Sequence, residues 1–173
     1  MADTLVIFFS RQGQNYLDGN IVNLEKGNTK ICAETIANAV GADLFEVIPL
    51  KSYPEGYREC TEVAKAELKA HLRPALRQTL QDVAKYKNIF VCGPCWWGTF
   101  PMPIFTALES LDLSNKKVMV LVTHEGSGVA SCAKDVARVC MGVQIVSSLA
   151  IRGGDCASKQ DAVMKWALST NQD

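Results

Sequence analysis

Five apolar segments are spaced along the chain, and each is short enough to form one β-strand. They are rich in branched and aromatic residues, and they span Leu5–Phe9, Leu44–Ile48, Ile89–Cys92, Val118–Val122 and Val143–Ile151. Each is followed by a segment with apolar residues at helical spacing: one that starts at Asn28 or Thr29, then Tyr57–Ala70, Pro103–Leu111, Ser127–Cys140 and Ala157–Leu168. This repeated strand–helix pattern predicts an α/β fold in which helices cover both faces of a parallel sheet.

The polarity of the five strands indicates their order in the sheet. The first, third and fourth are almost continuously apolar, as central strands are, whereas the second and fifth carry polar residues and should be edges. With right-handed crossovers, this favours a five-stranded parallel sheet in the order 2-1-3-4-5, in a single domain spanning residues 1–173. Ligands of such sheets bind beyond the carboxyl ends of the strands, where the winding direction reverses. The loops after the first, third and fourth strands should therefore line one site.

The first of these loops has the composition of an anion site. It runs from Ser10 and Arg11 to a helix that should begin with Asn28 or Thr29 as its N-cap. The first amides of a helix have no partner within it, and the helix dipole places partial positive charge there. Together with the hydroxyls and the arginine, these amides could hold a phosphate. The alternative is an ordinary capped strand–loop–helix without a ligand.

The loop after the third strand contains two adjacent tryptophans, Trp96 and Trp97, between glycines and prolines. One interpretation is a stacking surface for a flat ligand, since aromatic faces favour offset contact with other π-systems. The other is that one indole caps the core and the second covers a neighbouring helix. The loop after the fourth strand, Thr123–Gly128, contains His124, which either contacts the ligand or only bonds the backbone. Its glycines allow the backbone to approach a ligand closely.

Composition excludes several classes of function. Lys+Arg and Asp+Glu both number 18, and no basic run indicates nucleic acid. The N-terminal apolar run is too short for a signal peptide or a membrane span, so we expect a soluble cytoplasmic protein. The seven cysteines are odd in number and scattered, which favours free thiols, and the two histidines are not spaced as metal ligands, so we expect no metal.

Motifs along nearly the whole chain resemble the flavodoxin family, in particular a branch with a Trp-Trp-Gly-Thr loop and a Thr-His-x-Gly-Ser-Gly loop. They are Trp96–Pro103 and Thr123–Gly128, supported by Gly41–Glu46, Arg73–Leu76 and Leu108–Ser114. The resemblance implies a flavodoxin-like three-layer sandwich that binds FMN without a covalent bond. It implies that the phosphate lies at Ser10, Arg11, Gln12, Asn28 and Thr29, and that the ring lies against Pro94, Cys95, Trp96, Trp97, Gly98, Thr99, His124, Gly126, Ser127 and Gly128.

The phosphate loop departs from the family's compact Ser-x-Thr-Gly-Asn-Thr. Here Ser10-Arg11-Gln12 is separated from Gly27-Asn28-Thr29 by an insertion that runs through Lys26. We expect the insertion to arch out as a lid while its two ends still meet. Asn15 or Tyr16 could then reach the flavin.

The resemblance implies a carrier of electrons between a redox partner protein, or a small-molecule acceptor, and the flavin, with no catalytic residue of its own. An NAD(P)H-dependent FMN oxidoreductase acting on quinone-like acceptors is the alternative, favoured by the neutral charge, because carriers are usually acidic. A non-catalytic FMN-binding module is a third possibility. A distant alternative is a thiol–disulfide oxidoreductase that uses Cys92 and Cys95, which form a Cys-x-x-Cys motif.

Overall fold

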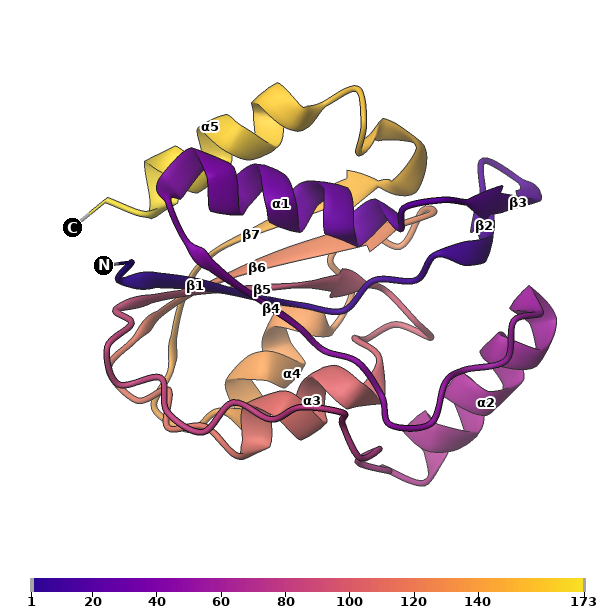
Figure 1. Ribbon diagram of the computed structural model, residues 1–173, viewed down its shortest axis with the longest axis horizontal. Helices are drawn as coiled ribbons and strands as arrows, with labels where there is room; N and C mark the ends of the chain where they lie inside the picture. Colours follow the sequence, from indigo (N-terminus) through magenta and orange to yellow (C-terminus); the bar gives the residue numbers. More distant parts are fainter. Residues whose placement is uncertain (1, 173) are drawn as a thin grey trace.

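A five-stranded parallel sheet forms the centre of the protein, in a computed structural model that describes residues 2–172 (Figure 1). Its strands are β1 (Thr4–Phe8), β4 (Asp43–Glu46), β5 (Asn88–Pro94), β6 (Lys117–His124) and β7 (Gln144–Arg152). They lie in the order β4-β1-β5-β6-β7, which is the predicted order 2-1-3-4-5. The predicted α/β sandwich and its two edge strands are therefore confirmed. Because the strands are parallel, the carboxyl ends of β1, β5 and β6 lie side by side at the same end of the sheet.

Helices cover both faces of the sheet. α1 (Asn28–Val40) and α5 (Gln160–Thr170) lie on one face, and α3 (Met102–Glu109) and α4 (Cys132–Val139) on the other (Figure 1). Each face buries its own apolar cluster, because successive side chains of a strand point to opposite sides. No helix within residues 2–172 has the length and apolar character needed to cross a membrane.

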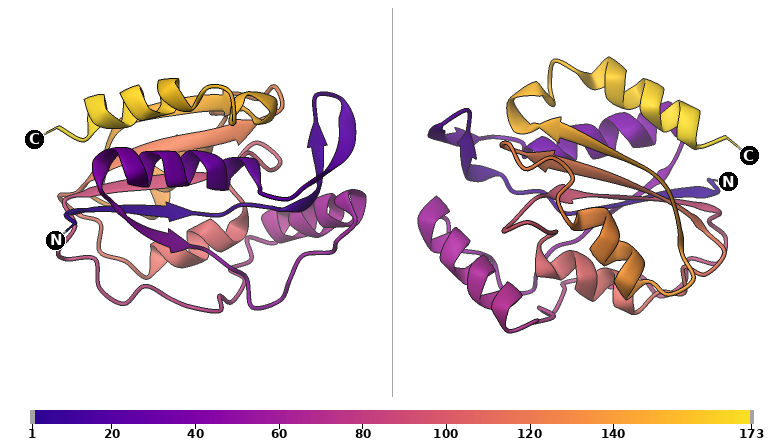
Figure 2. Two further views of the ribbon diagram at one scale, coloured as in Figure 1. Left: turned by 45° about the horizontal axis from the view of Figure 1, so that its top comes forward. Right: turned by 180° about the vertical axis from the view of Figure 1, so that it is seen from behind.

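α2 (Tyr57–Lys69) does not cover a face of the sheet. It lies beyond the carboxyl ends of the strands, beside the insertion (Figure 2). The apolar spacing of this segment predicts that Cys60, Val63, Ala64 and Leu68 face the core. Cys60 and Ala64 are buried, but Val63 is 39% exposed. That expectation was wrong for Val63, since a helix that packs only by its edge buries a narrower stripe.

The insertion is an antiparallel hairpin that sequence analysis did not identify. Its strands are β2 (Gly13–Leu17) and β3 (Asn20–Leu24), which pair only with each other. Asp18 and Gly19 form the turn with φ values of 49° and 89°, and two left-handed residues in succession are typical of a type I′ hairpin turn. The hairpin projects beyond the carboxyl edge of the sheet (Figure 2).

Three predicted helix starts were wrong, those of α1, α4 and α5, and α5 begins at Gln160 rather than Ala157. The N-cap of α1 is Gly27 rather than Asn28 or Thr29, and the side chain that receives a helix amide comes from Ser10, whose Oγ accepts from the N–H of Lys30 at 3.0 Å. α4 begins at Cys132 rather than Ser127. Left-handed φ values at Gly128 (65°) and Ala130 (47°) prevent a helix from starting earlier.

Candidate functional site

A cavity of about 140 Å³ lies where the carboxyl ends of β1, β5 and β6 meet the hairpin. We call it the site cavity. It is lined by Arg11, Asn15, Tyr16, Asn28, Thr29, Tyr57, Pro94, Cys95, Trp96, Thr123, His124, Glu125 and Gly153. All three loops expected to converge contribute to it, and Asn15 and Tyr16 of the insertion form one wall.

The start of α1 supplies amide donors to this cavity. Within residues 2–172, the N–H groups of Asn28 and Thr29 have no acceptor, whereas Lys30 donates to Ser10 Oγ and Ile31 to the Gly27 carbonyl at 3.4 Å. The hydroxyl of Thr29 is buried against the hydroxyl of Thr123 at 2.7 Å. Two free amides at a helix N-terminus make a binding site for an anionic group.

The backbone of residues 10–11 lies close to the start of α1 beside this site. A Cβ atom at Gly27 would collide with Ser10 Oγ and would lie 2.6 Å from the carbonyl oxygen of Arg11. The two ends of the insertion therefore meet, as expected. A glycine at this position lets the 10–11 backbone pack directly against the first turn of α1.

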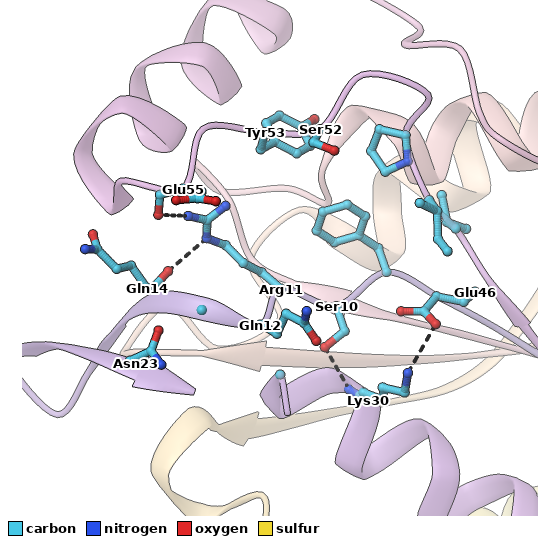
Figure 3. Close-up of a pocket in the computed structure, with 16 residues that line it drawn as sticks. Ser10, Arg11, Gln12, Gln14, Asn23, Lys30, Glu46, Ser52, Tyr53 and Glu55 are labelled. Atoms are coloured by element: carbon cyan, nitrogen blue, oxygen red, sulfur yellow. Dashed lines mark hydrogen bonds and ion pairs between the residues drawn. The ribbon is translucent and has the colours of Figure 1, made fainter. Parts of the chain in front are cut away.

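Arg11 is held by backbone carbonyls. Its Nε donates to the Gln14 carbonyl at 2.9 Å, and its Nη2 donates to the Glu55 carbonyl at 2.8 Å (Figure 3). Nη2 also donates to the Pro54 carbonyl at 2.9 Å. The guanidinium therefore joins the base of the hairpin to the loop before α2. It also places a permanent positive charge at the wall of the site cavity.

A second cavity, of about 780 Å³, opens on the β4 side of Arg11 (Figure 3). Ser10 and Gln12 line this cavity and not the site cavity. Lys30 and Glu46 form an ion pair of 3.3 Å on its wall. The five residues expected around a phosphate are thus divided: Asn28 and Thr29 line the site cavity, Ser10 and Gln12 line the second cavity, and Arg11 lines both.

The two tryptophans lie in different environments. Trp96 is half-buried and makes edge contacts with Phe9 and Tyr53, each with 5.1 Å between ring centroids. Trp97 is 50% exposed and turns to α2, where its Nε1 donates to the Thr61 carbonyl at 2.9 Å and Lys65 lies over its ring. Trp96 therefore lines the site cavity, whereas Trp97 covers a helix.

Trp97 and Gly98 form a tight turn between Trp96 and Thr99. Their φ values are 55° and 84°, and the Trp96 N–H donates to the Thr99 carbonyl at 2.7 Å. Gly98 and Thr99 are tied to α4: the Gly98 carbonyl accepts from the N–H of Ser131 at 2.9 Å, and Thr99 Oγ1 donates to Asp135 at 2.7 Å. Neither residue lines the site cavity.

The loop after β6 is organised by His124, which lines the site cavity. Its Nδ1 accepts from the N–H of Gly126 at 2.9 Å, so this nitrogen carries no proton. Gly126 and Ser127 are exposed, and the hydroxyl of Ser127 donates to the Gly128 carbonyl. Partial burial and the charge of Arg152 lower the pKa of His124, opposed by Glu125.

We expect this loop to lose stability as the pH falls. Because the folded pKa of His124 lies below its unfolded value of about 6.5, its contribution is full above that pH and is lost as the pH drops through the folded pKa. Replacing His124 with Gln should make the urea midpoint fall less between pH 7 and pH 5 than it does in the wild type. Equal falls in both proteins would contradict this assignment.

Cys92 and Cys95 do not form a thiol pair. Cys92 is completely buried in the cluster under α1 and α5, whereas Cys95 packs against the cluster on the opposite face. Burial raises the pKa of Cys92. The Cys-x-x-Cys alternative therefore fails, because the first cysteine lies within a strand and points away from the second.

Comparisons with known proteins support the fold. A family model described as flavodoxin matches residues 23–169. No curated protein sequence matches the chain. A Bacteroides eggerthii protein classed as a flavoprotein superimposes with a TM-score of 0.72 at 22% identity, covering 99% of both chains. A Lactobacillus acidophilus flavoprotein in complex with FMN gives 0.64 at 18% identity, covering 92% of this chain and 98% of that one.

An NADH:FMN oxidoreductase in its apo form gives a TM-score of 0.55 at 15% identity, covering 99% of this chain and 92% of that one. These identities are low, so the three structures establish the shared fold alone. The family model covers most of the chain, and this chain therefore belongs to the flavodoxin family.

Proposed function

We propose that this chain binds FMN non-covalently in the site cavity and carries electrons through it. One observation carries the proposal: the free backbone amides of Asn28 and Thr29 lie beside a cavity lined by aromatic rings, at the carboxyl ends of the strands. An anion site beside an aromatic slot matches a molecule that is phosphorylated at one end and flat at the other.

The donor set fits FMN in its chemistry. The amides of Asn28 and Thr29 and the charge of Arg11 suit a phosphate, and the rings of Tyr16, Tyr57 and Trp96 suit a flavin. The volume is small, since ligand cavities usually measure roughly 300–1,000 Å³. The hairpin must therefore move outward to admit the ring.

The known flavoproteins support this assignment. The Lactobacillus acidophilus flavoprotein, which shares the fold over 92% of this chain, was crystallised with FMN. Because the chain belongs to the flavodoxin family, a flavin is the expected cofactor at the carboxyl ends of the strands.

Binding, orientation and exclusion of water are the tasks of the protein residues. FMN, when bound, supplies the redox chemistry. Asn28 and Thr29 would hold the phosphate by their N–H groups, and Trp96 and Tyr16 would keep water from the ring. His124, whose Nδ1 is occupied by the Gly126 N–H, can offer only its Nε2 side to a ligand.

A second function is reduction of quinone-like acceptors at the expense of NAD(P)H. The equal numbers of acidic and basic residues favour it, because carriers that dock on basic partners are usually acidic. The shared fold with an NADH:FMN oxidoreductase is compatible with this function.

Two measurements test these proposals. We expect the purified protein, once titrated with FMN, to bind it with an affinity at least tenfold higher than that for riboflavin, because the phosphate contacts two charge-assisted donors. Equal affinities, or no binding of either, would refute the site. NADH or NADPH added anaerobically should then bleach the yellow complex within seconds if the protein is a reductase, and leave it yellow if it is a carrier.

A further inference from the structure

Two glycines directly after β7, Gly153 and Gly154, lie under the tip of the hairpin. Gly153 is buried and lines the site cavity. A Cβ atom at Gly153 would collide with the Glu125 carboxylate. It would also lie 2.6 Å from Asn28 Nδ2 and 3.0 Å from Leu17 Cδ1. The hairpin, the start of α1 and the loop after β6 therefore meet at one residue that has no side chain.

Gly154 makes the corresponding contact with the turn of the hairpin. A Cβ atom there would collide with the Asp18 carboxylate and would lie 3.1 Å from its Cγ. Positive φ values occur at neither Gly153 nor Gly154, so the backbone conformation does not require glycine. The close approach of the hairpin does require it. We call these two residues the glycine seat.

Two polar contacts accompany this packing. The Asp18 N–H donates to the Glu125 carboxylate at 3.1 Å, and Arg152 Nη2 lies 3.6 Å from Asp18 Oδ1. The Arg152 and Asp18 side chains are 53% and 63% exposed, so their ion pair contributes little to stability. The fit of the tip to the glycine seat, rather than charge, therefore fixes its position.

The other end of the hairpin is held separately. Arg11 joins its base to the carbonyls of Pro54 and Glu55 before α2. Asn15 and Tyr16, which line the site cavity, lie between this base and the tip. Because β2 and β3 pair only with each other, and a two-stranded hairpin alone is marginally stable, the order of the hairpin depends on these two attachments.

We propose that the glycine seat is the surface on which the hairpin closes over the site cavity, and that release from it opens the cavity to a ligand. Only the tip has to lift, while the base stays attached through Arg11. The turn after β7 is thereby a fourth segment of the site, besides the loops after β1, β5 and β6. The closure belongs to the chain without a ligand, whereas its effect on FMN rests on the proposed function.

Amide hydrogen exchange of residues 13–24, without added ligand, tests the closure. Gly153→Ala should make the hairpin exchange about tenfold faster, because the added methyl group displaces Leu17 and a released hairpin is marginally stable. Gly93→Ala is the control, since a Cβ there would lie 2.8 Å from the Phe100 ring in the core. It should lower the free energy of unfolding and leave exchange in the hairpin unchanged. Exchange as slow in Gly153→Ala as in the wild type would overturn the proposal.

A double variant shows whether the tip contacts the glycine seat directly. Gly154→Ala should speed exchange in the hairpin about threefold, but in an Asp18→Gly background it should have no effect, because the carboxylate that the methyl group meets is gone. The turn tolerates Asp18→Gly, since glycine readily adopts the φ of 49° at this position. An effect of Gly154→Ala on its own turn alone would persist in that background, and this result would contradict the proposed contact.

Stopped-flow mixing with FMN tests the effect on a ligand. Asp18 and Gly154 do not line the site cavity, so they touch no ligand there. FMN should nevertheless associate about threefold faster with Gly154→Ala than with the wild type, because entry no longer waits for the tip to lift. Faster exchange with unchanged association would refute the opening step. If exchange responds as expected and FMN does not bind, the proposed function fails and the closure stands.

Discussion

Replacing Gly27 with Ala is expected to lower FMN affinity by about 10- to 100-fold and to leave riboflavin affinity within about threefold. The added Cβ would collide with Ser10 Oγ and the Arg11 carbonyl. Because the 10–11 backbone must then move off the first turn of α1, the donors around Asn28 and Thr29 would separate. Charge-assisted hydrogen bonds contribute about 1.5–3 kcal/mol each, and 1.4 kcal/mol corresponds to tenfold. Isothermal titration with both ligands measures the effect.

Gly56→Ala is the matched control. Gly56 precedes α2 with φ −64° and ψ 131°, close to the φ −63° and ψ 148° of Gly27 before α1. The three atoms nearest to a Cβ at Gly56 would all belong to the carboxylate of Glu59, which is the flexible end of a side chain. We expect this variant to bind FMN as the wild type does.

Gly27→Ala should also lower the free energy of unfolding by about 1–3 kcal/mol, since it overpacks a buried contact. If both variants bind FMN alike, the phosphate lies elsewhere.

The sheet could be predicted because each central strand is buried on both faces and is therefore apolar throughout. β1 shows this most clearly, with Leu5, Val6 and Ile7 each at most 1% exposed. The hairpin was missed for a different reason: its strands are polar and half-exposed, as in Gly13–Leu17. Asp18-Gly19, between two five-residue segments, was the available signal, since this dipeptide is typical of type I′ turns.

The convergence of the three loops could be predicted from sheet topology, but the direction of individual side chains could not. Trp97 and Trp96 are adjacent, yet a left-handed φ at Trp97 turns its ring away to α2. That outcome matches the interpretation in which one indole packs at the core and the other covers a helix.

Deleting the hairpin is expected to weaken FMN binding by about tenfold or more, mainly through faster dissociation. Tyr16, stacked on Tyr57 with ring centroids 6.0 Å apart, forms the outer wall of the site cavity. An aromatic contact contributes about 0.5–1.5 kcal/mol beyond the free energy of the area it buries. Loss of this wall would remove that contact and expose the flavin ring to water. Association should become faster, because no element then has to swing away from a cavity of about 140 Å³.

The fold should tolerate this deletion. β2 and β3 pair only with each other, and Gly27 lies against Arg11, so a short Gly-Ser linker can replace Gly13–Leu24. Hydrogen bonds hold the hairpin in place. The Asp18 N–H donates to the Glu125 carboxylate at 3.1 Å, and the Tyr57 N–H donates to the Gln14 side-chain oxygen at 2.9 Å. Such exposed polar contacts can open without disturbing the core.

Two point variants distinguish the wall from the hairpin as a whole. Tyr16 and Ile21 lie opposite each other in the hairpin, and both are exposed, but only Tyr16 lines the site cavity. Tyr16→Ala should reproduce most of the increase in the dissociation rate, measured by stopped-flow flavin fluorescence, whereas Ile21→Ala should not. Were the deletion and Tyr16→Ala both to leave dissociation unchanged, the ring would have to bind outside the hairpin's reach. The 780 Å³ cavity beside Ser10 and Gln12 would then be the place to look for it.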